Sequence, residues 1–248
     1  MNTPRTVIVT GASSGLGFAI AEAYLKRGDN VVGNGRSLAR LEQAAARLGH
    51  PSNLRLVAGD IGLPQTSQRL FDEALASFGQ VDILISNAGI FIPKPVGDYT
   101  EEDFEAIVST NLKGFFYPAQ AAARHMAARG TGHIVAITAS IALQPNTQVP
   151  ALLPVLVKGG LNQAVRALAL ELASAQVMVN GVAPGIIDTP LHQADEQTRE
   201  GLKTLAPTGR IGTAQDVVEA VLYLTDSTFV TGTVLAVDGG SASGVWSV

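Results

Sequence analysis

Residues 6–17 read TVIVTGASSGLG, and this short segment joins two kinds of pattern. Its first part, Thr6–Val9, is a run of β-branched residues typical of a buried strand. Its second part holds three glycines and leads into the helical spacing of residues 15–27. Glycines between a strand and a helix allow a tight bend and a close approach of the backbone to a bound group. The segment therefore predicts the first strand–turn–helix unit of an α/β fold.

The same alternation of short apolar runs and longer helical segments continues along the chain. The predicted strands are residues 6–9, 30–33, 54–58, 81–85, 133–137, 177–182 and 234–237. The predicted helices are residues 15–27, 38–48, 64–78, 101–128, 154–173 and 214–224. Apolar strands separated by helices are typical of a parallel sheet buried on both faces. We predict an α/β Rossmann fold, a doubly wound parallel sheet of about seven strands with helices on both faces and ligands at the carboxyl ends of its strands.

Two segments interrupt this rhythm. Residues 142–154 hold three prolines, and residues 184–212 hold Pro-Gly and Thr-Pro pairs around a short polar helix. Long irregular connections often carry function, so we predict two substrate loops here, with ordinary surface excursions as the alternative. No linker, charge block or repeat divides residues 1–248, which predicts a single domain.

The composition excludes several classes of protein. The chain is 46% hydrophobic with a formal charge of −4, which argues against disorder and against a nucleic-acid partner. The absence of cysteine excludes disulfides and thiolate chemistry, and the four histidines show no metal-ligand spacing. No apolar run is long enough for a membrane span, and residues 1–5 leave no room for a signal peptide. We therefore expect a cytoplasmic protein without a membrane partner.

The glycine-rich turn predicts a dinucleotide site. The N-terminus of the following helix supplies amide donors and the positive end of a helix dipole to a pyrophosphate. The spacing of Gly11, Gly15 and Gly17 differs from the general dinucleotide fingerprint, and the turn lacks the ending of a P-loop. Its place between the first strand and the first helix nevertheless favours dinucleotide binding over a purely structural turn.

The end of the second predicted strand bears on which dinucleotide would bind. A site for NAD has an acidic residue there to accept hydrogen bonds from the ribose hydroxyls. Residues 32–36 read VGNGR instead, and Arg36 can bind a 2′-phosphate through charge-assisted hydrogen bonds. We therefore predict NADP(H) in preference to NAD(H), with a solvated arginine as the alternative. Ser14 stands where a second basic residue would strengthen this preference.

Several motifs together resemble those of the short-chain dehydrogenases/reductases. Residues 10–17 resemble that family's TGxxxGxG motif, residues 86–89 (SNAG) are similar to its NNAG motif, and residues 237–240 (VDGG) close the pattern. The likeness covers about residues 6–240. It implies a nicotinamide-dependent oxidoreductase acting on a carbonyl or alcohol, and a homodimer or homotetramer paired through the helices at residues 101–128 and 154–173.

The resemblance also implies functional residues. Ser140, Lys158 and Asn111 match the catalytic serine, lysine and asparagine of the family. No metal site is implied. The implied cofactor-binding residues are Gly11, Ser13, Ser14, Gly15, Leu16, Gly17, Arg36, Asp60, Ile61, Asn87, Ala88, Gly89, Lys158, Pro184, Gly185, Ile187 and Thr189.

One position departs from the family pattern. The catalytic tyrosine of the family lies four residues before the lysine, and Pro154 stands there in this chain. In the family the tyrosine transfers a proton while hydride passes between the nicotinamide and the carbonyl carbon. A positioned general acid typically contributes about 10²–10⁴ in rate, so its loss should slow carbonyl reduction. The fold should tolerate the change, because proline fits the first turn of a helix.

The missing tyrosine leaves three hypotheses about function. The first is an NADP(H)-dependent oxidoreductase with an apolar substrate, in which Lys158, a relay through Ser140 or Thr138, or His192 supplies the proton. The second is a non-catalytic NADP(H)-binding pseudoenzyme or sensor. The third is non-redox chemistry in the same pocket, such as isomerisation or elimination.

Overall fold

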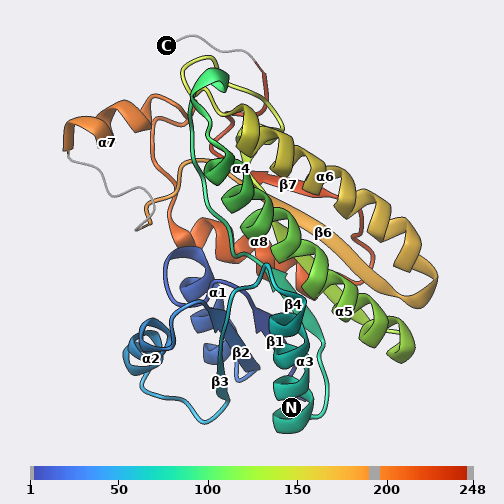
Figure 1. Cartoon of the computed structure of the whole chain (residues 1–248). Coiled ribbons are helices and arrows are strands. Elements are labelled where there is room, and N and C mark those ends of the chain that lie inside the picture. Colours follow the sequence, from blue (N-terminus) through green and yellow to red (C-terminus); the bar gives the residue numbers. More distant parts are fainter. Residues whose placement is uncertain (1–2, 190–195, 245–248) are drawn as a thin grey trace.

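The computed structural model describes residues 3–189 and 196–244 (Figure 1). In these ranges one parallel sheet of seven strands has the order β3-β2-β1-β4-β5-β6-β7. The strands are β1 (Thr6–Val9), β2 (Asn30–Gly35), β3 (Leu54–Ala58), β4 (Ile83–Ser86), β5 (Gly132–Ile137), β6 (Val177–Pro184) and β7 (Val234–Val237). The predicted doubly wound parallel sheet is confirmed.

Helices cover both faces of this sheet. The described helices are α1 (Gly15–Lys26), α2 (Leu38–Arg47), α3 (Pro64–Phe78), α4 (Glu101–Ile107), α5 (Gly114–Arg129), α6 (Leu152–Leu172), α7 (Glu196–Lys203) and α8 (Ala214–Asp226). Short 3₁₀ turns lie at Val96–Asp98, Ser140–Ala142 and Ala173–Ala175. Helices α3, α5 and α6 pack on one face, and α1 and α8 pack on the other (Figure 1). None of these helices is long and apolar enough to cross a bilayer.

The two faces explain why the strands lack a polar alternation. Neighbouring side chains of a strand point to opposite faces, and both faces are covered. In β1, Ile8 belongs to the core under α3, α5 and α6, whereas Val7 and Val9 belong to the core under α1 and α8. All three side chains are fully buried.

The strand order places a topological switch beside β1. The chain builds β1, β2 and β3 in one direction, and then returns to place β4 on the other side of β1. The connections that leave the carboxyl ends of β1 and β4 therefore diverge and open a crevice between them. Residues 10–17 and 87–92, which follow these strands, lie at this crevice.

The long helix predicted for residues 101–128 is interrupted. Helix α4 ends at Ile107, and a π-helical turn, Val108–Lys113, separates it from α5. The wider turn contains Asn111, whose side chain is 98% buried and bonds to the backbone of Ile90. Periodicity alone does not reveal such a turn, because the period of the apolar pattern changes over a single turn of the helix only. The helix predicted to begin at Pro154 also differs, since α6 begins two residues earlier.

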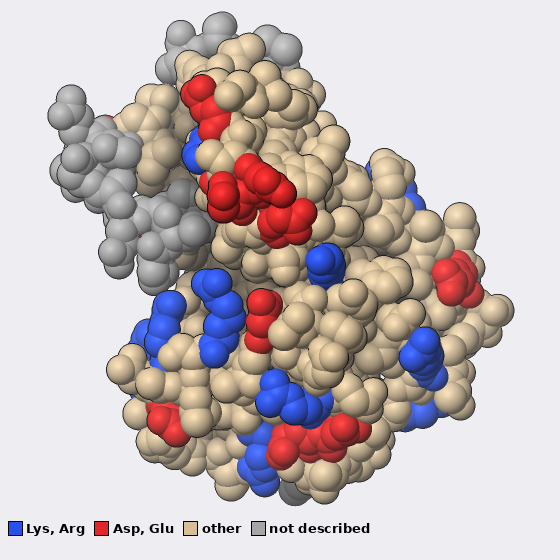
Figure 2. All heavy atoms as spheres, viewed as in Figure 1, with Lys and Arg blue, Asp and Glu red and all other residues tan. Residues whose placement is uncertain are grey.

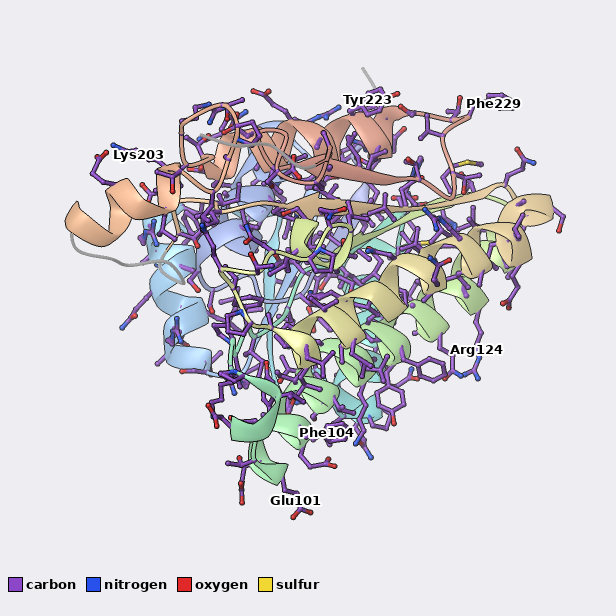
Figure 3. All side chains as sticks on the ribbon, turned by 90° about the horizontal axis from the view of Figure 1, so that it is seen from above. Glu101, Phe104, Arg124, Lys203, Tyr223 and Phe229 are labelled. Atoms are coloured by element: carbon purple, nitrogen blue, oxygen red, sulfur yellow. The ribbon has the colours of Figure 1, made fainter. Side chains whose placement is uncertain are left out.

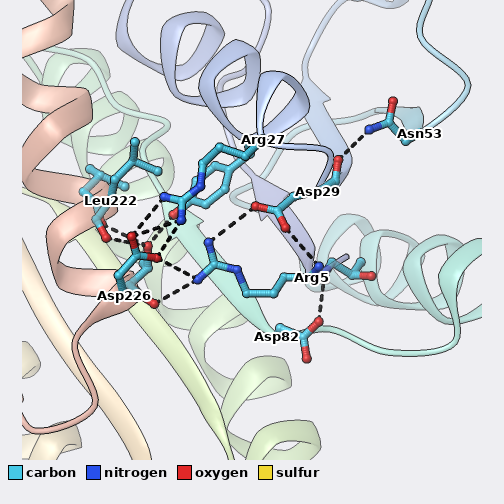
Figure 4. Close-up of polar contacts among 11 residues, drawn as sticks. Arg5, Arg27, Asp29, Asn53, Asp82, Leu222 and Asp226 are labelled. Atoms are coloured by element: carbon cyan, nitrogen blue, oxygen red, sulfur yellow. Dashed lines mark hydrogen bonds and ion pairs between the residues drawn. The ribbon is translucent and has the colours of Figure 1, made fainter. Parts of the chain in front are cut away.

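The opposite, amino-terminal edge of the sheet is closed by polar side chains (Figure 4). Arg5 donates to Asp29 and Asp226, and Arg27 donates to Asp226 at 3.0 Å. Beneath these ion pairs, the buried hydroxyls of Tyr24 and Thr225 are hydrogen-bonded at 2.7 Å, and burial raises the pKa of Tyr24. These contacts tie α1 to α8 at the edge away from the crevice.

Close packing of glycine backbones holds the start of α1 against β4. A β-carbon at Gly17 would lie 2.3 Å from the carbonyl oxygen of Gly11 and 2.5 Å from Asn87 Nδ2. Both distances are far shorter than a van der Waals contact, so no larger residue fits at position 17 unless the backbone moves.

We expect Gly17→Ala to lower the melting temperature by about 4–10 °C, because the added methyl group separates α1 from the turn before it. Gly201→Ala is the matched control, since a β-carbon at Gly201 in α7 would meet nothing within 4 Å. Thermal unfolding followed by circular dichroism measures both variants. Equal melting temperatures for the two variants would contradict the packing argument.

Candidate active site

The glycine-rich turn offers amide donors at the crevice. Gly11 and Gly15 have left-handed φ angles of +70° and +56°, which other residues rarely adopt. Ser14 is the N-cap of α1, and its side chain makes no capping hydrogen bond. The first amides of a helix lack intrahelical acceptors, and the first turn of α1 contains no acidic residue. The start of α1 therefore suits an anion such as a diphosphate.

A buried hydroxyl joins this turn to the end of β4. Thr10 Oγ1 accepts hydrogen bonds from the backbone N–H groups of Asn87 and Ala88, both at 2.9 Å. Asn87 Nδ2 donates to the Thr10 carbonyl oxygen at 2.8 Å. These bonds place Asn87 and Ala88 beside the glycine-rich turn. This role of Thr10 was not predicted from the sequence, and its place directly before Gly11 is the signal that could have indicated it.

Two of the three candidate catalytic residues converge on Gly89. A β-carbon at Gly89 would lie 3.1 Å from Asn111 Oδ1 and 3.3 Å from Lys158 Nζ. Asn111 Oδ1 accepts from the backbone N–H of Ile90 at 2.8 Å, and its Nδ2 donates to the carbonyl oxygen of Ile90 at 2.9 Å. The π-helical turn and α6 are thus joined at the end of β4, although they lie far apart in the sequence.

Lys158 is a buried cation at the end of β5. Its Nζ donates to the carbonyl oxygen of Ile137 at 2.8 Å and forms no ion pair with a described residue. Burial lowers the pKa of Lys158 to about 8, because the ammonium group loses the solvation that stabilises its charge. An ammonium group has three N–H donors, so it can also donate to a bound molecule.

Ser140 and Pro154 lie on the elements that flank this lysine. Ser140 is 92% buried and begins the 3₁₀ turn that follows β5, the strand whose last carbonyl binds Lys158. Pro154 is the third residue of α6, and the first hydrogen bond of that helix runs from Val155 N–H to the Ala151 carbonyl. The helix therefore loses no internal bond at Pro154, and the expected tolerance of proline in the first turn is confirmed.

Three of the predicted cofactor-binding residues, Arg36, Asp60 and Ile61, follow the carboxyl ends of β2 and β3, where the buried Asn34 joins the two strands. Asn34 is 99% buried, and its Nδ2 donates to the carbonyl oxygens of Val57 and Gly59. Arg36 is exposed, directly after β2. Asp60 is also exposed, and its Oδ1 accepts from the backbone N–H of Gly62.

Ile61 lies deeper than its neighbours. Its side chain is 97% buried in the core under α5 and leaves no space for a β-carbon at Gly114. Its side chain therefore packs, and only its backbone can serve a ligand at this edge.

The structure also brings together two residues that the sequence analysis did not connect. Arg40 Nη2 in the first turn of α2 donates to Ser14 Oγ in the glycine-rich turn at 3.5 Å. Figure 2 shows Lys and Arg side chains gathered over α2, whereas Asp and Glu side chains gather over the start of α4. Ser14 thus has a basic neighbour, although it comes from another element.

The segment after β6 packs against the end of β7 and the residues that follow it. Gly185 N–H donates to the Val237 carbonyl oxygen at 3.0 Å, and a β-carbon at Gly185 would lie 2.8 Å from Asp238 Cα. Ile187 is 97% buried and pairs with Gly212 in a single parallel bridge. Pro184 and Thr189 flank this segment, and the candidate proton donor His192 lies outside the described residues.

A metal site and a separate cavity were also considered as functional sites. The described residues include no cluster of three or more His, Asp or Glu side chains that could hold a metal ion. A cavity of about 350 Å³ lies between residues 186–187, 206–216 and 236–243. Its lining contains none of Asn111, Ser140 and Lys158, so this cavity is separate from the candidate catalytic residues.

Comparison with known proteins agrees with this arrangement. A family model described as enoyl-(acyl carrier protein) reductase matches residues 11–242. The chain is 33% identical to a glucose 1-dehydrogenase of Gluconobacter oxydans over 244 residues, 95% of this chain and 91% of that protein. It is 32% identical to the 3-oxoacyl-[acyl-carrier-protein] reductase FabG of Salmonella typhimurium, over 95% of this chain and 96% of FabG.

A solved structure extends the likeness to the whole fold. The structure described as ElxO with NADP bound has a TM-score of 0.91 and 25% sequence identity, and the match covers 98% of this chain and 100% of that one. The parallel sheet, the glycine-rich turn at β1 and the match over residues 11–242 together identify the family. The chain belongs to the short-chain dehydrogenases/reductases, a family of oxidoreductases.

Proposed function

We propose that this protein is an NADP(H)-dependent oxidoreductase that acts on a carbonyl or alcohol and has Pro154 at the position of the family's catalytic tyrosine. The observation that carries the proposal is the convergence of Lys158 Nζ and Asn111 Oδ1 on Gly89, at the crevice beside the glycine-rich turn. Lys158 would also serve a protein that only binds a dinucleotide, but Ser140 and Asn111 together with a lysine of lowered pKa favour catalysis, because perturbed titratable groups gather at functional sites.

The residues at the crevice fit a nicotinamide dinucleotide. The amides at the start of α1 suit the diphosphate, and the space beside Gly11 and Gly17 admits no β-carbon. We assign Ser13, Gly15, Leu16 and the other cofactor-binding residues predicted above to this cofactor. The bound cofactor supplies or accepts the hydride. FabG and the NADP-bound ElxO are relatives whose chemistry or ligand agrees with this choice.

The candidate catalytic residues would act on the carbonyl oxygen and on the ribose. Ser140 donates a hydrogen bond to the carbonyl oxygen, Lys158 binds the ribose hydroxyls, and Asn111 holds the end of β4 through Ile90. When hydride reaches the carbonyl carbon, the oxygen needs one proton to become an alcohol. Pro154 has no hydroxyl and cannot provide it.

We assign this proton to Lys158, directly or through one water molecule. The lysine is charged at neutral pH, and its lowered pKa makes it a stronger acid than a solvated lysine. Thr138 is less suitable, because its buried hydroxyl already donates to the Val182 carbonyl. Solvent restores the proton on Lys158 after each turnover.

The substrate pocket is proposed to be apolar. Ile107, Leu153 and Val157 form a small buried cluster, and Ile90, Ile92 and Tyr99 pack against it. Leu153 and Val157 lie on α6, which also carries Lys158. Ile107 ends α4, directly before the π-helical turn that contains Asn111. We propose that this apolar cluster and the predicted substrate loops at residues 142–154 and 184–212 surround an apolar carbonyl compound. We also propose that residues 1–248 form a single domain. The cytoplasmic location remains a prediction.

A homodimer or homotetramer is proposed from the exposed apolar side chains. Phe104, Phe116 and Leu156 on α4, α5 and α6 are between 46% and 61% exposed. Tyr223 and Phe229 lie at the opposite edge of the molecule from Phe104 (Figure 3). Exposed aromatic and aliphatic groups on neighbouring helices are typical of subunit interfaces.

The main test of catalysis compares the wild type with two substitutions at position 154, Pro154→Tyr and Pro154→Phe. Fluorescence titration with NADPH and absorbance decay with a panel of aldehydes and ketones measure binding and turnover. We expect turnover in the wild type, its loss in Lys158→Ala, and a rise of about 10²–10⁴ in Pro154→Tyr, the usual worth of a general acid. Pro154→Phe is the matched control, because it adds the ring without the hydroxyl.

A different result would favour the rival function. Tight NADPH binding with no wild-type turnover, and activity in Pro154→Tyr alone, would indicate a non-catalytic NADP(H)-binding protein. Conversion of a substrate without any change in NADPH absorbance would indicate isomerisation or elimination.

The role of Lys158 predicts how the rate depends on pH. Its folded pKa is about 8, so the ammonium form is present below that value and is lost as pH rises through it. We expect kcat for carbonyl reduction to fall above about pH 8, and Pro154→Tyr to keep its rate to higher pH. Steady-state kinetics at saturating NADPH from pH 6.5 to 9.5 provide the measurement. A wild-type kcat that does not change over this range would remove Lys158 as the proton donor.

The proposed assembly has a separate test. We expect size-exclusion chromatography with light scattering to give the mass of a dimer or a tetramer for the wild type and a smaller mass for Phe116→Asp. Leu75→Asp serves as the control, because Leu75 on α3 is 38% exposed and lies outside the proposed interface. A wild-type monomer would contradict the proposal.

A further inference from the structure

The cavity of about 350 Å³ lies where three segments of the chain meet beyond the carboxyl ends of β6 and β7. They are residues 186–187 after β6, residues 206–216 between α7 and α8, and residues 236–243 at the end of β7 and after it. Sites for small molecules typically enclose about 300–1,000 Å³, so this cavity has room for a compact ligand.

Backbone hydrogen bonds hold the walls of the cavity together. Gly212 N–H donates to the Ile186 carbonyl oxygen at 2.9 Å, and Thr208 N–H donates to the Gly239 carbonyl oxygen at 3.2 Å. The first bond joins the segment after β6 to the segment before α8, and the second joins that segment to the residues after β7. The cavity is therefore framed by paired backbone rather than by side chains alone.

Part of the lining is apolar. Ile187 and Val237 contribute branched side chains, and Ala206 contributes a methyl group from the segment before α8. Thr208 adds a hydroxyl group, which can accept or donate a hydrogen bond. A ligand that fits this cavity would bury carbon atoms as well as a polar group.

Two of the three charged residues in the lining neutralise each other. Arg210 Nη1 and Nη2 donate to the two carboxylate oxygens of Asp216, both at 2.9 Å. Asp216 also accepts from the backbone N–H and the hydroxyl of Thr213, the N-cap of α8. These hydrogen bonds, the one from Arg210 foremost, hold the pKa of Asp216 well below its usual value. This ion pair is complete and adds no net charge to the cavity.

The third charged residue of the lining, Asp238, has no cation beside it. Its Oδ1 accepts from Gly240 N–H at 2.9 Å and its Oδ2 accepts from Ala242 N–H at 2.8 Å. It forms no ion pair with any residue in the ranges 3–189 and 196–244. A carboxylate can accept about four hydrogen bonds, so Asp238 keeps acceptor sites for a ligand. The charged side chains of the lining therefore sum to one negative charge.

We propose that this cavity is a second binding site, which takes a small organic cation with an apolar portion. The ammonium group of such a ligand donates to the Asp238 carboxylate, and its carbon atoms contact Ile187 and Val237. The site is independent of the proposed function, because its lining contains none of the candidate catalytic residues. Ile187 is also among the predicted cofactor-binding residues, so an occupant would contact the segment proposed to hold the cofactor.

The experiment compares two probes of similar shape and opposite charge. Ligand-observed NMR titrations with benzylammonium and with benzoate are applied to the wild type, Asp238→Asn and Ala206→Leu, with and without saturating NADPH. Asp238→Asn removes the charge, and Ala206→Leu fills the cavity. Asp72→Asn and Ala76→Leu are the matched controls, because both residues are exposed on α3 and lie outside the cavity lining.

We expect the wild type to bind benzylammonium at least about tenfold more tightly than benzoate, a ratio typical of a charge-assisted hydrogen bond. Asp238→Asn should lose most of this difference, and Ala206→Leu should lose the binding of benzylammonium. Both control variants should behave as the wild type. Saturating NADPH should not displace benzylammonium, because the cavity lies apart from the crevice.

Three results would overturn the inference. The first is that the wild type does not bind benzylammonium, and the second is that Asp238→Asn binds it as tightly as Asp72→Asn does. The third is displacement of the probe by NADPH, which would place it in the crevice. Ala206→Leu leaves Asp238 unchanged, so it tests the site even if Asp238→Asn lowers stability. None of these results affects the proposed function, which is tested by turnover and by NADPH binding.

Discussion

The backbone contact between Gly17 and Gly11 supports the rest of the crevice. Because Gly17 has no side chain, α1 begins directly against the turn that leaves β1, and its first amides lie beside the end of β4. The Thr10 hydroxyl then fixes the backbone of Asn87 and Ala88. Gly89 lies two residues after Asn87, so the place where Asn111 and Lys158 meet depends on the same packing. A larger residue at position 17 would disturb both the proposed diphosphate site and the proposed catalytic site.

The most unusual feature of the site is a buried ammonium group that pairs with no anion among the residues that the structure describes. Lys158 donates to one carbonyl oxygen and carries a lowered pKa because of burial alone. In such surroundings the charged form is costly unless a bound molecule contributes oxygen acceptors. The proline four residues earlier removes a hydroxyl without removing a helical hydrogen bond, so the loss affects chemistry and leaves α6 intact. Stability and proton transfer are separable at position 154 for this reason.

Local patterns were sufficient for the sheet and for the order of its helices. A buried parallel strand needs β-branched residues on both faces, and a helix needs its own period, so both leave marks within a few residues. The interruption at Val108–Lys113 was missed because a π-helical turn changes the period over one turn only. The tertiary structure shows what this turn does: it places Asn111 where its side chain bonds to the backbone of Ile90, in the connection that follows β4.

The identities of Gly17, Lys158 and Pro154, and the absence of a carboxylate after β2, were readable along the chain. They established the fold class, the family resemblance and the missing hydroxyl. Tertiary structure alone decided that Lys158 is buried without a described ion-pair partner, that Asn111 faces Gly89, and that Arg40 reaches Ser14. The physical reason is that burial, pKa and charge pairing depend on residues far apart in the chain, which only the packing of the sheet and its helices brings into contact.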